Sequence, residues 1–382
     1  MKKYLFLTAI LLQAISLQVF GVELDSGRWK PENRKVLTKL IDENKNKNNY
    51  VVFDWDYTSI YQDTQENLFR YQIDNLKFKM TPKEFAIAIR KDIPSDNFSD
   101  EYVNVNGEKI NIDKIAEDLD KDYNFLYNNY IKDSKMSLEK IKETEEFKDF
   151  RGKLAFLYEA IGGSFSHDIA YPWVLYLFTG MDKNEVQKLA KEANDYGIGN
   201  KLGKYTIESS DILLGKAGKV SYKYKSGLRT QPETANLFHQ LIENGITVYV
   251  VSASLEDIVE VFATDKSYGY NLNPENIYGM RLEMNGDKYT TEYKHDYPQT
   301  QTKGKVEIIN KFLKPKHDGK EPILVAGDSS GDKNMLTEYK GTKILLLMKR
   351  PGKLDGLSKD KRALIQPRNP QTGLLDPAKN NK

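Results

Sequence analysis

Residues 50–58 read Tyr50-Val51-Val52-Phe53-Asp54-Trp55-Asp56-Tyr57-Thr58. The first four side chains are apolar or aromatic, which is typical of a buried strand. Asp54 and Asp56 follow at its carboxyl end, where an extended backbone points both carboxylates one way and Trp55 the other. Open α/β sheets bind ligands at the carboxyl ends of their strands. Because crowded acids repel each other, the pair indicates a bound cation and separate roles for the two carboxylates.

Three later segments carry polar residues that such a site needs. A run rich in β-branched residues, 246–251, ends in Ser252-Ala253-Ser254, and a short apolar run, 323–326, ends in Gly327-Asp328-Ser329-Ser330-Gly331-Asp332. Between them, Lys305 opens a helical pattern over 305–313. Each segment alone is typical of an ordinary turn, cap or surface helix. Together, with three of the four motifs preceded by predicted strands, they predict an α/β fold in which one sheet edge carries a shared site.

These four motifs resemble those of the haloacid dehalogenase-like (HAD) hydrolase superfamily, most of whose members are phosphatases. The match extends from about Trp29 to about Leu347, with an insertion after the first motif. The resemblance implies a Rossmann-like parallel-sheet core with an inserted, mostly helical cap. Further segments are similar to secreted bacterial phosphorylcholine phosphatases, namely Gly27-Arg28-Trp29, Phe53-Asp54-Trp55-Asp56, Tyr171-Pro172-Trp173 through Met181, Tyr249 through Ser254, and Tyr278 through Leu282.

The resemblance also implies chemical roles. Asp54 is expected to be the nucleophile that forms an aspartyl-phosphate, and Asp56 to give a proton to the leaving oxygen and then take one from water. Thr58 is expected to orient the loop. Ser252 should hydrogen-bond a transferring oxygen, and Lys305 should neutralise charge on the phosphate and the nucleophile. Neutralisation matters because each like-charge pair costs about 4 kcal/mol at ~4 Å and an effective dielectric constant of ~20.

The family resemblance implies a metal site of oxygen ligands. Asp328 is expected to bind the metal beside Asp54 and the Asp56 backbone carbonyl, and Asp332 to hold the metal or its waters. Hard oxygen ligands of this kind select Mg²⁺, which is the expected cofactor. The chain has no cysteine, which excludes thiol chemistry. No metal-ligand spacing is present among its four histidines, His167, His239, His295 and His317.

The expected partner is a small phosphorylated metabolite. Four residues within or beside the motifs are expected to contact it: Trp55, Tyr57, Ser252 and Ala253. Phosphocholine would need an aromatic or acidic cradle for its quaternary ammonium group. Further candidates by residue type are Tyr61, Tyr171 and Trp173, although residues 171–178 also have the pattern of a core helix.

The leading function is an exported, Mg²⁺-dependent phosphomonoesterase for a small phosphorylated alcohol such as phosphocholine. The alternative among enzymes is a phosphatase for phosphoserine or another small metabolite, and phosphotransfer to another acceptor also stays open. A non-catalytic binding protein on this scaffold is disfavoured because every key acid and the lysine are present. A formal net charge of +2, with charges well mixed, argues against nucleic-acid binding. The sequence indicates no oligomeric state.

Residues 1–21 are expected to be a secretory signal peptide. Met1-Lys2-Lys3 is basic, and the apolar run over 4–20 is interrupted by polar residues. That run is too short and broken to be a stable membrane span. Cleavage after Gly21 is preferred to cleavage after Ser16, and the mature protein is expected to be periplasmic or secreted.

The expected organisation is a core divided by an insertion. The core is expected over 22–76 and 226–350, the helical cap over 77–225, and a loose polar tail over 351–382. Within the core, Asn285-Gly286 predicts a hairpin turn. Residues 342–348 are expected to form the last strand of the parallel sheet.

Overall fold

The computed structural model describes residues 22–378. Six parallel strands form one sheet in the order β10-β9-β8-β1-β4-β5. Their bounds are β1 Asn49–Phe53, β4 Ile246–Leu255, β5 Ile277–Met280, β8 Leu324–Gly327, β9 Ile344–Met348 and β10 Ala363–Gln366. The predicted α/β class with a Rossmann-like parallel sheet is therefore confirmed.

Helices cover both faces of this sheet. Alternate residues of β1 point to opposite faces, so Val51 and Phe53 lie in one hydrophobic cluster and Tyr50 and Val52 in another. The first cluster includes apolar residues of α1 (Pro31–Asn44), α9 (Pro232–Glu243) and α10 (Glu256–Thr264). The second includes residues of α11 (Lys303–Ile308) and α12 (Lys333–Glu338). Burial on both faces explains why the β1 sequence is a continuous apolar run rather than an alternating one.

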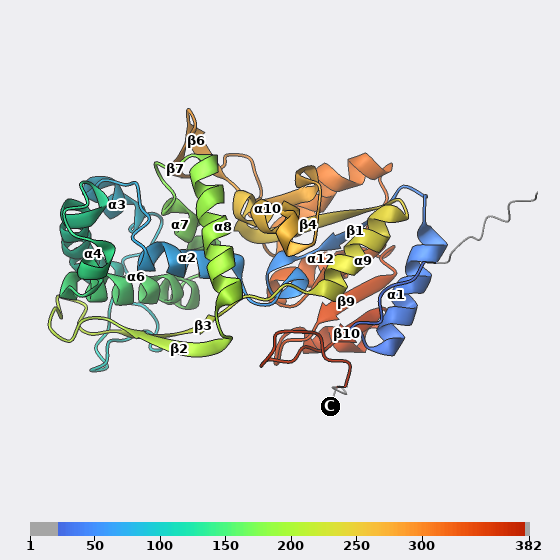
Figure 1. Ribbon diagram of the computed structural model, residues 1–382, viewed down its shortest axis with the longest axis horizontal. Coiled ribbons are helices and arrows are strands. Elements are labelled where there is room, and N and C mark those ends of the chain that lie inside the picture. The colour runs from blue at the N-terminus through green and yellow to red at the C-terminus, as the bar shows by residue number, and fades with distance from the viewer. Residues whose placement is uncertain (1–21, 379–382) are drawn as a thin grey trace, which may run out of the picture.

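A second lobe, mostly helical, lies beside the sheet (Figure 1). Its helices are α2 Thr64–Asp74, α3 Pro82–Ala88, α4 Ile112–Leu126, α5 Leu138–Lys142, α6 Glu145–Ser164, α7 His167–Tyr176 and α8 Lys183–Gly199. Two antiparallel hairpins accompany them, β2 (Gly203–Glu208) with β3 (Ser221–Ser226), and β6 (Leu282–Asn285) with β7 (Lys288–Tyr293). The second hairpin confirms the predicted Asn285-Gly286 turn. We call this helical lobe the cap.

Helix α2 packs with the cap rather than with the sheet. Leu68, Phe69 and Ile73 lie in the same hydrophobic cluster as the buried residues of α4 and α6. We therefore propose that the first core segment ends near residue 63 instead of residue 76. In this proposal the cap is still a single insertion after the first motif, and it includes one more helix than the sequence predicts.

The tail expected over 351–382 includes strand β10, so we propose that the core extends to about residue 368. Strand β10 pairs in parallel with β9 and forms an edge of the sheet, beyond the strand predicted to be last. Gln366 is fully buried, and its side-chain oxygen accepts hydrogen bonds from the Lys30 backbone and the Asn33 side chain. A strand of only four residues between polar segments gives little sequence signal.

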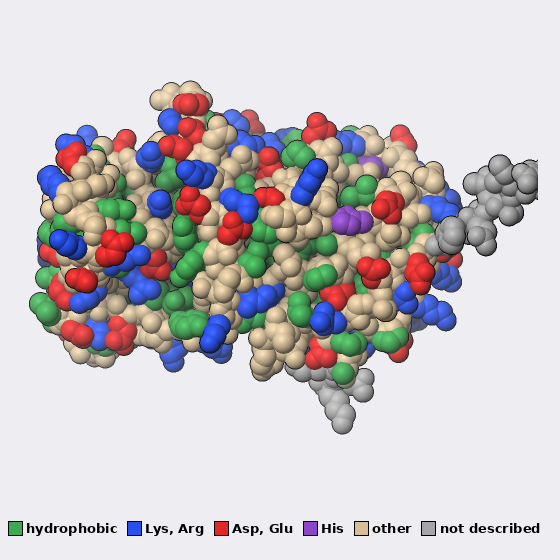
Figure 2. Space-filling view, in the orientation of Figure 1, with side chains coloured by type: hydrophobic (Ala, Val, Ile, Leu, Met, Phe, Trp, Pro, Cys, Tyr) green, Lys and Arg blue, Asp and Glu red, His purple; other side chains and the backbone are tan. Residues whose placement is uncertain are grey.

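The surface of the face in Figure 2 carries Lys and Arg side chains interspersed with Asp and Glu over both lobes. This mixing agrees with the small net charge of +2. Among the described helices, none has the length and apolar character that a membrane crossing requires.

Candidate active site

The predicted motifs converge at the carboxyl edge of the sheet. Asp54 follows β1, Ser252 lies near the end of β4, and Asp328 follows β8, the strand beside β1. Helix α11 brings Lys305 to the same place, where its ammonium contacts Asp54. The chain thus brings together side chains from four separate segments, in the arrangement that the order of the motifs predicts.

In the loop after β1, Asp54 and Asp56 point away from the tryptophan between them. The backbone is extended at Asp54 and Asp56 and turns left-handed at Tyr57, with φ of 56°. Trp55 is fully buried and packs edge-on against Phe262 and Tyr270 in the core. The structure therefore does not support the expected contact between Trp55 and the substrate, because its indole points away from the acids.

Lys305 lies between two buried carboxylates. Its Nζ donates to Asp54 Oδ1 at 2.5 Å and to Asp332 Oδ1 at 2.8 Å. Burial alone lowers the pKa of Lys305, but the charges of Asp332 and Asp54 outweigh it and raise that pKa above its ordinary value. Burial and the nearby Asp332 raise the pKa of Asp54, while Lys305 opposes the rise. The lysine therefore keeps Asp54 closer to the ionised form that a nucleophile requires.

The donor set of this site fits a divalent cation. Asp54, Asp328 and Asp332 are all buried, and each places one carboxylate oxygen within 4.8 Å of the others. The Thr58 hydroxyl lies 3.0 Å from Asp54 Oδ2 and 3.3 Å from Asp328 Oδ1, so it links the first and last motifs. Clustered carboxylate oxygens suit Mg²⁺ better than softer metals.

Asp332 also shapes the loop that presents Asp328. Its Oδ2 accepts hydrogen bonds from the backbone N–H groups of Asp328 and Ser329, at 2.9 and 3.1 Å. A Cβ on Gly327 would lie only 2.6 Å from the Cβ of Asp332. Glycine at this position lets Asp332 approach closely enough to hold the loop.

The Asp56 carboxylate lies outside this acidic cluster and is held by hydroxyl and backbone donors. Its Oδ1 accepts from the Thr64 N–H and hydroxyl, each at 2.7 Å. Its Oδ2 accepts from Ser254 Oγ at 2.7 Å and from Ser252 Oγ at 3.3 Å. Burial raises the pKa of Asp56, and the hydrogen bonds from Thr64 and Ser254 limit the rise. A carboxyl group with opposing influences of this kind can both donate and accept a proton.

Two arginines that sequence reasoning missed contact residues of the site. Arg350 follows β9 and donates to Asp328 Oδ2 at 2.6 Å, while its guanidinium lies 3.8 Å from the centre of the Tyr57 ring. Arg368 follows β10 and donates to the backbone carbonyls of Tyr57 and Ile60. Both cations follow parallel strands, a position that marks the ligand edge of the sheet once the strands are known.

The acids open into a cavity of about 430 Å³ between the core and the cap. Ser252, Ala253, Lys305 and the aspartates line one part of it. The cap contributes two tyrosines, a histidine and several carboxylates, namely Tyr158, Tyr171, His167, Asp63, Glu66, Glu159 and Asp168. The cavity therefore connects the aspartates and Lys305 of the core to an aromatic and acidic region of the cap.

Only some of the predicted aromatic candidates line this cavity. Tyr57 and Tyr171 line the cavity, and the ring of His167 stacks on that of Tyr171 with 4.9 Å between centroids. Trp173 is fully buried and donates to the backbone of Ile89, so it is a core residue of the cap. Tyr61 lines a different cavity. Sequence reasoning missed Tyr158 because it lies in the middle of a long helix with no motif.

Glu159 provides a titratable carboxylate in this region. The Tyr222 hydroxyl donates to it at 2.9 Å. Burial and the neighbouring Glu66 raise the pKa of Glu159 to about 7. Glu66 itself lies 3.6 Å from Arg70, which offsets part of its charge. A cation bound beside these groups would favour the ionised form of Glu159.

Comparison with known proteins gives three findings. Residues 216–337 match the family model described as haloacid dehalogenase-like hydrolase. The chain is 26% identical to the phosphorylcholine phosphatase of Pseudomonas aeruginosa over 354 residues, which covers 85% of this chain and 80% of that protein. A solved structure of a conserved, functionally unknown protein from Anaerococcus prevotii is 32% identical, with a TM-score of 0.88, over 95% of this chain and 100% of the other.

Proposed function

The chain belongs to the haloacid dehalogenase-like hydrolase family, as its motifs predicted, and from this premise we propose that it is a Mg²⁺-dependent phosphomonoesterase for a small cationic alcohol. Phosphocholine is the first candidate substrate. The enzyme class, a phosphatase of this family, agrees with the sequence prediction. The observation that carries the substrate proposal is the cavity in which the acid and lysine centre faces tyrosines and carboxylates of the cap.

The proposed reaction begins at Asp54. One of its carboxylate oxygens attacks the phosphorus, the bond from phosphorus to the alcohol oxygen breaks, and Asp56 transfers its proton to that oxygen. The hydrogen bonds from Thr64 and Ser254, which hold the Asp56 carboxylate outside the acidic cluster, support this role. The products of this step are the free alcohol and an aspartyl-phosphate on Asp54.

The second half of the reaction returns the enzyme to its starting state. Water attacks the phosphorus, Asp56 accepts a proton from it, and the bond between phosphorus and Asp54 breaks to release phosphate. Lys305 stays beside Asp54 and balances charge through both halves. When bound by Asp54, Asp328 and Asp332, Mg²⁺ would supply further positive charge against the repulsion between carboxylate and phosphate.

The cap side of the cavity favours a cationic leaving group. Tyr158 and Tyr171 line this side of the cavity and supply aromatic rings, whose contact with a quaternary ammonium is worth about 0.5–2 kcal/mol. Glu66 and Glu159 add negative charge to the same region. Phosphoserine, the alternative substrate, carries an ammonium that these acids would attract but also a carboxylate that they would repel. Phosphocholine carries the cation alone, so the site favours it.

Export is proposed on the basic and apolar segment over residues 1–21, which lies outside the described residues. The absence of cysteine from the whole chain is compatible with an oxidising compartment.

The direct test is phosphate release by the chain lacking residues 1–21. Substrates are phosphocholine, phosphoethanolamine, phosphoserine and ethyl phosphate, each with Mg²⁺ and with EDTA. We expect release only with Mg²⁺ and the highest kcat/KM for phosphocholine. Tyr171→Leu should raise KM for phosphocholine more than for ethyl phosphate, whereas Tyr171→Phe, which keeps the ring, should not. Equal kcat/KM for phosphocholine and ethyl phosphate, without competition by choline, would refute the substrate proposal.

A further inference from the structure

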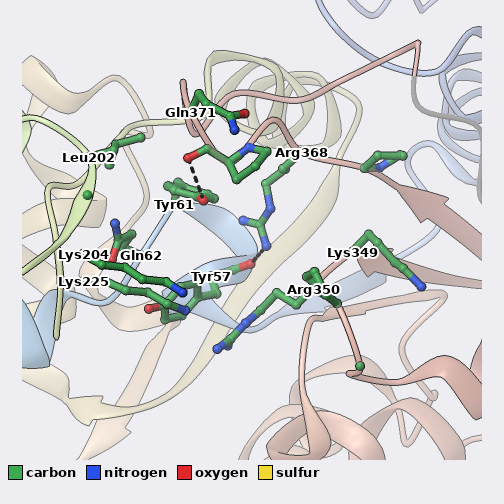
Figure 3. A pocket seen from close by; sticks show the side chains of 15 residues that line it. Tyr57, Tyr61, Gln62, Leu202, Lys204, Lys225, Lys349, Arg350, Arg368 and Gln371 are labelled. Atoms are coloured by element: carbon green, nitrogen blue, oxygen red, sulfur yellow. Dashed lines mark hydrogen bonds between the residues drawn. The ribbon is translucent and has the colours of Figure 1, made fainter. Parts of the chain in front are cut away.

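A second, larger cavity of about 860 Å³ lies between the cap and the core. Its walls come from the β2–β3 hairpin, the loop after β1, and the segments that follow β9 and β10 (Figure 3). It shares Tyr57 and Arg350 with the candidate active site. Its volume lies within the range of small-molecule sites.

The charge of this cavity is opposite to that of the catalytic one. Five cationic side chains line it: Lys204, Lys225, Lys349, Arg350 and Arg368. As far as the structure describes its walls, they include no Asp or Glu. The lining also includes three prolines, two tyrosines and a leucine, so the cavity offers positive charge on a partly apolar surface.

Several of these cations are not neutralised by an acid. Lys349 pairs with Asp355 and Arg350 with Asp328, whereas within residues 22–378 neither Lys204 nor Lys225 forms an ion pair. Figure 3 shows the ends of Lys204, Lys225 and Arg350 reaching the same region beside Tyr57, while Lys349 points away. Lys225 lies over the Tyr57 ring, with Nζ 5.3 Å from its centre.

The cations of this cavity lower one another's pKa values through electrostatic repulsion. Partial burial and the nearby Arg350 lower the pKa of Lys225. Arg368 is only 6% exposed, and its Nε has no hydrogen-bond partner. Burial lowers the pKa of Arg368 to about 10, and Arg350 adds to that effect. An anion placed among these groups would offset their mutual repulsion.

We propose that this cavity binds a small polyanion that carries phosphate or another multivalent oxyanion. Lys204, Lys225 and Arg350 contact the anionic groups, and the tyrosine and proline surfaces accommodate the rest of the ligand. Two features argue for more than one anionic group: the number of cations around the cavity and its size, which is twice that of the catalytic cavity. The proposal does not rest on the proposed function, since the cavity contains none of the motif acids and shares only Tyr57 and Arg350 with the candidate active site.

Isothermal titration calorimetry with pyrophosphate as the probe tests this proposal. The titration uses the full mature chain in EDTA, so that the acidic catalytic site, without a divalent cation, repels the probe. We expect saturable binding, and an affinity at least about tenfold lower in the double variant Lys204→Gln/Lys225→Gln. Both lysines lie exposed on the β2–β3 hairpin, so the variant is expected to fold, which its urea unfolding curve checks.

The matched control is Lys35→Gln/Lys333→Gln, which removes the same charge from exposed positions on α1 and α12. This control should bind pyrophosphate like the wild type. An equal loss in both double variants, unchanged binding in Lys204→Gln/Lys225→Gln, or no saturable binding by the wild type would overturn the proposal. A second titration with orthophosphate tests whether the cavity binds the released phosphate product instead of a larger ligand. A polyanion site should bind orthophosphate more weakly than pyrophosphate. Equal affinities for the two anions would refute the polyanion assignment.

Discussion

Lys305 Nζ lies 2.5 Å from Asp54 Oδ1, although 251 positions separate the two residues in the chain. Both are almost completely buried, with side-chain exposures of 3% and 9%. The contact joins the amino-terminal strand of the core to a helix that follows the whole cap in the sequence. Assembly of the nucleophile with its counter-charge therefore requires both core segments to fold together around the insertion.

Lys305→Met should damage both stability and turnover. The variant leaves Asp54 and Asp332 close together without their shared cation, and loss of one partner of a buried ion pair costs about 3–5 kcal/mol. Urea unfolding in EDTA measures this loss. Phosphate release at saturating Mg²⁺ should fall on the order of 10³-fold, because charge on the transferring group is no longer balanced.

Lys303→Met is the matched control for this variant, since Lys303 is exposed on the same helix. It should unfold and turn over like the wild type. If Lys305→Met and Lys303→Met have the same turnover, Lys305 has no catalytic role. A stable but inactive Lys305→Met would instead show that its contribution to folding is smaller than the geometry implies.

The convergence of the motifs was predictable because their signals are local. An apolar run that precedes Asp54 and another that precedes Asp328 each identify a strand from adjacent residues alone, and parallel topology then brings the strand ends together. The direction of Trp55 was predictable from strand alternation, yet its role was not. Whether a side chain that points away from the acids meets solvent, substrate or core depends on Phe262 and Tyr270, which pack against it from distant segments.

The pH dependence of substrate choice should follow Glu159. Its pKa of about 7 means that it ionises as the pH rises through neutrality, and an anionic Glu159 attracts the ammonium of phosphocholine. The ratio of kcat/KM for phosphocholine to that for ethyl phosphate should therefore rise across this range. The ratio cancels the titration of Asp56, which both reactions share, and comparison with a Glu159 variant separates the titration of the two substrates.

Glu159→Gln should make the rise of this ratio with pH smaller than in the wild type and raise KM for phosphocholine by about fivefold to tenfold. The remaining charged neighbours, Glu66, Arg70 and Lys225, stay in place in the variant. Glu143→Gln, at an exposed position of the cap, should leave the ratio profile unchanged. If the ratio rises equally with pH in Glu159→Gln and in the wild type, another group is responsible for the pH dependence.

Arg368→Met should destabilise the loop after β1. The variant removes the charged donor from the buried carbonyls of Tyr57 and Ile60, which costs about 2–4 kcal/mol. Tyr57 has a positive φ, so its conformation depends on such contacts. Denaturant unfolding measures the effect, with Lys361→Met in the same segment as the exposed control.

Deletion of residues 351–382 tests the same segment more severely. The truncated chain loses β10 and Arg368, and we expect it to lose cooperative unfolding or to unfold at much lower urea concentration. A truncated chain with full activity and an unchanged unfolding midpoint would restore the loose-tail prediction.

The site residues from the cap and from the carboxy-terminal segment could not be predicted in the same way, because no local sequence pattern marks them. Arg368 contacts a backbone carbonyl 311 positions away, and no side-chain pattern marks such a partner. Tyr158 and Glu159 lie within α6, a helix whose apolar residues are spread over most of its length, so periodicity does not show which side faces the cavity. These residues become identifiable only when the cap is placed over the sheet edge.

The central claim is that Asp54 accepts the phosphoryl group. Rapid acid quench of the enzyme during phosphocholine turnover with Mg²⁺, followed by peptide mass spectrometry, measures this directly. We predict a phosphorylated peptide that contains Asp54 and disappears in Asp54→Asn, together with a loss of phosphate release on the order of 10³-fold or more. Phosphate release by Asp54→Asn at the wild-type rate, or phosphorylation of another residue in the wild type, would contradict the account.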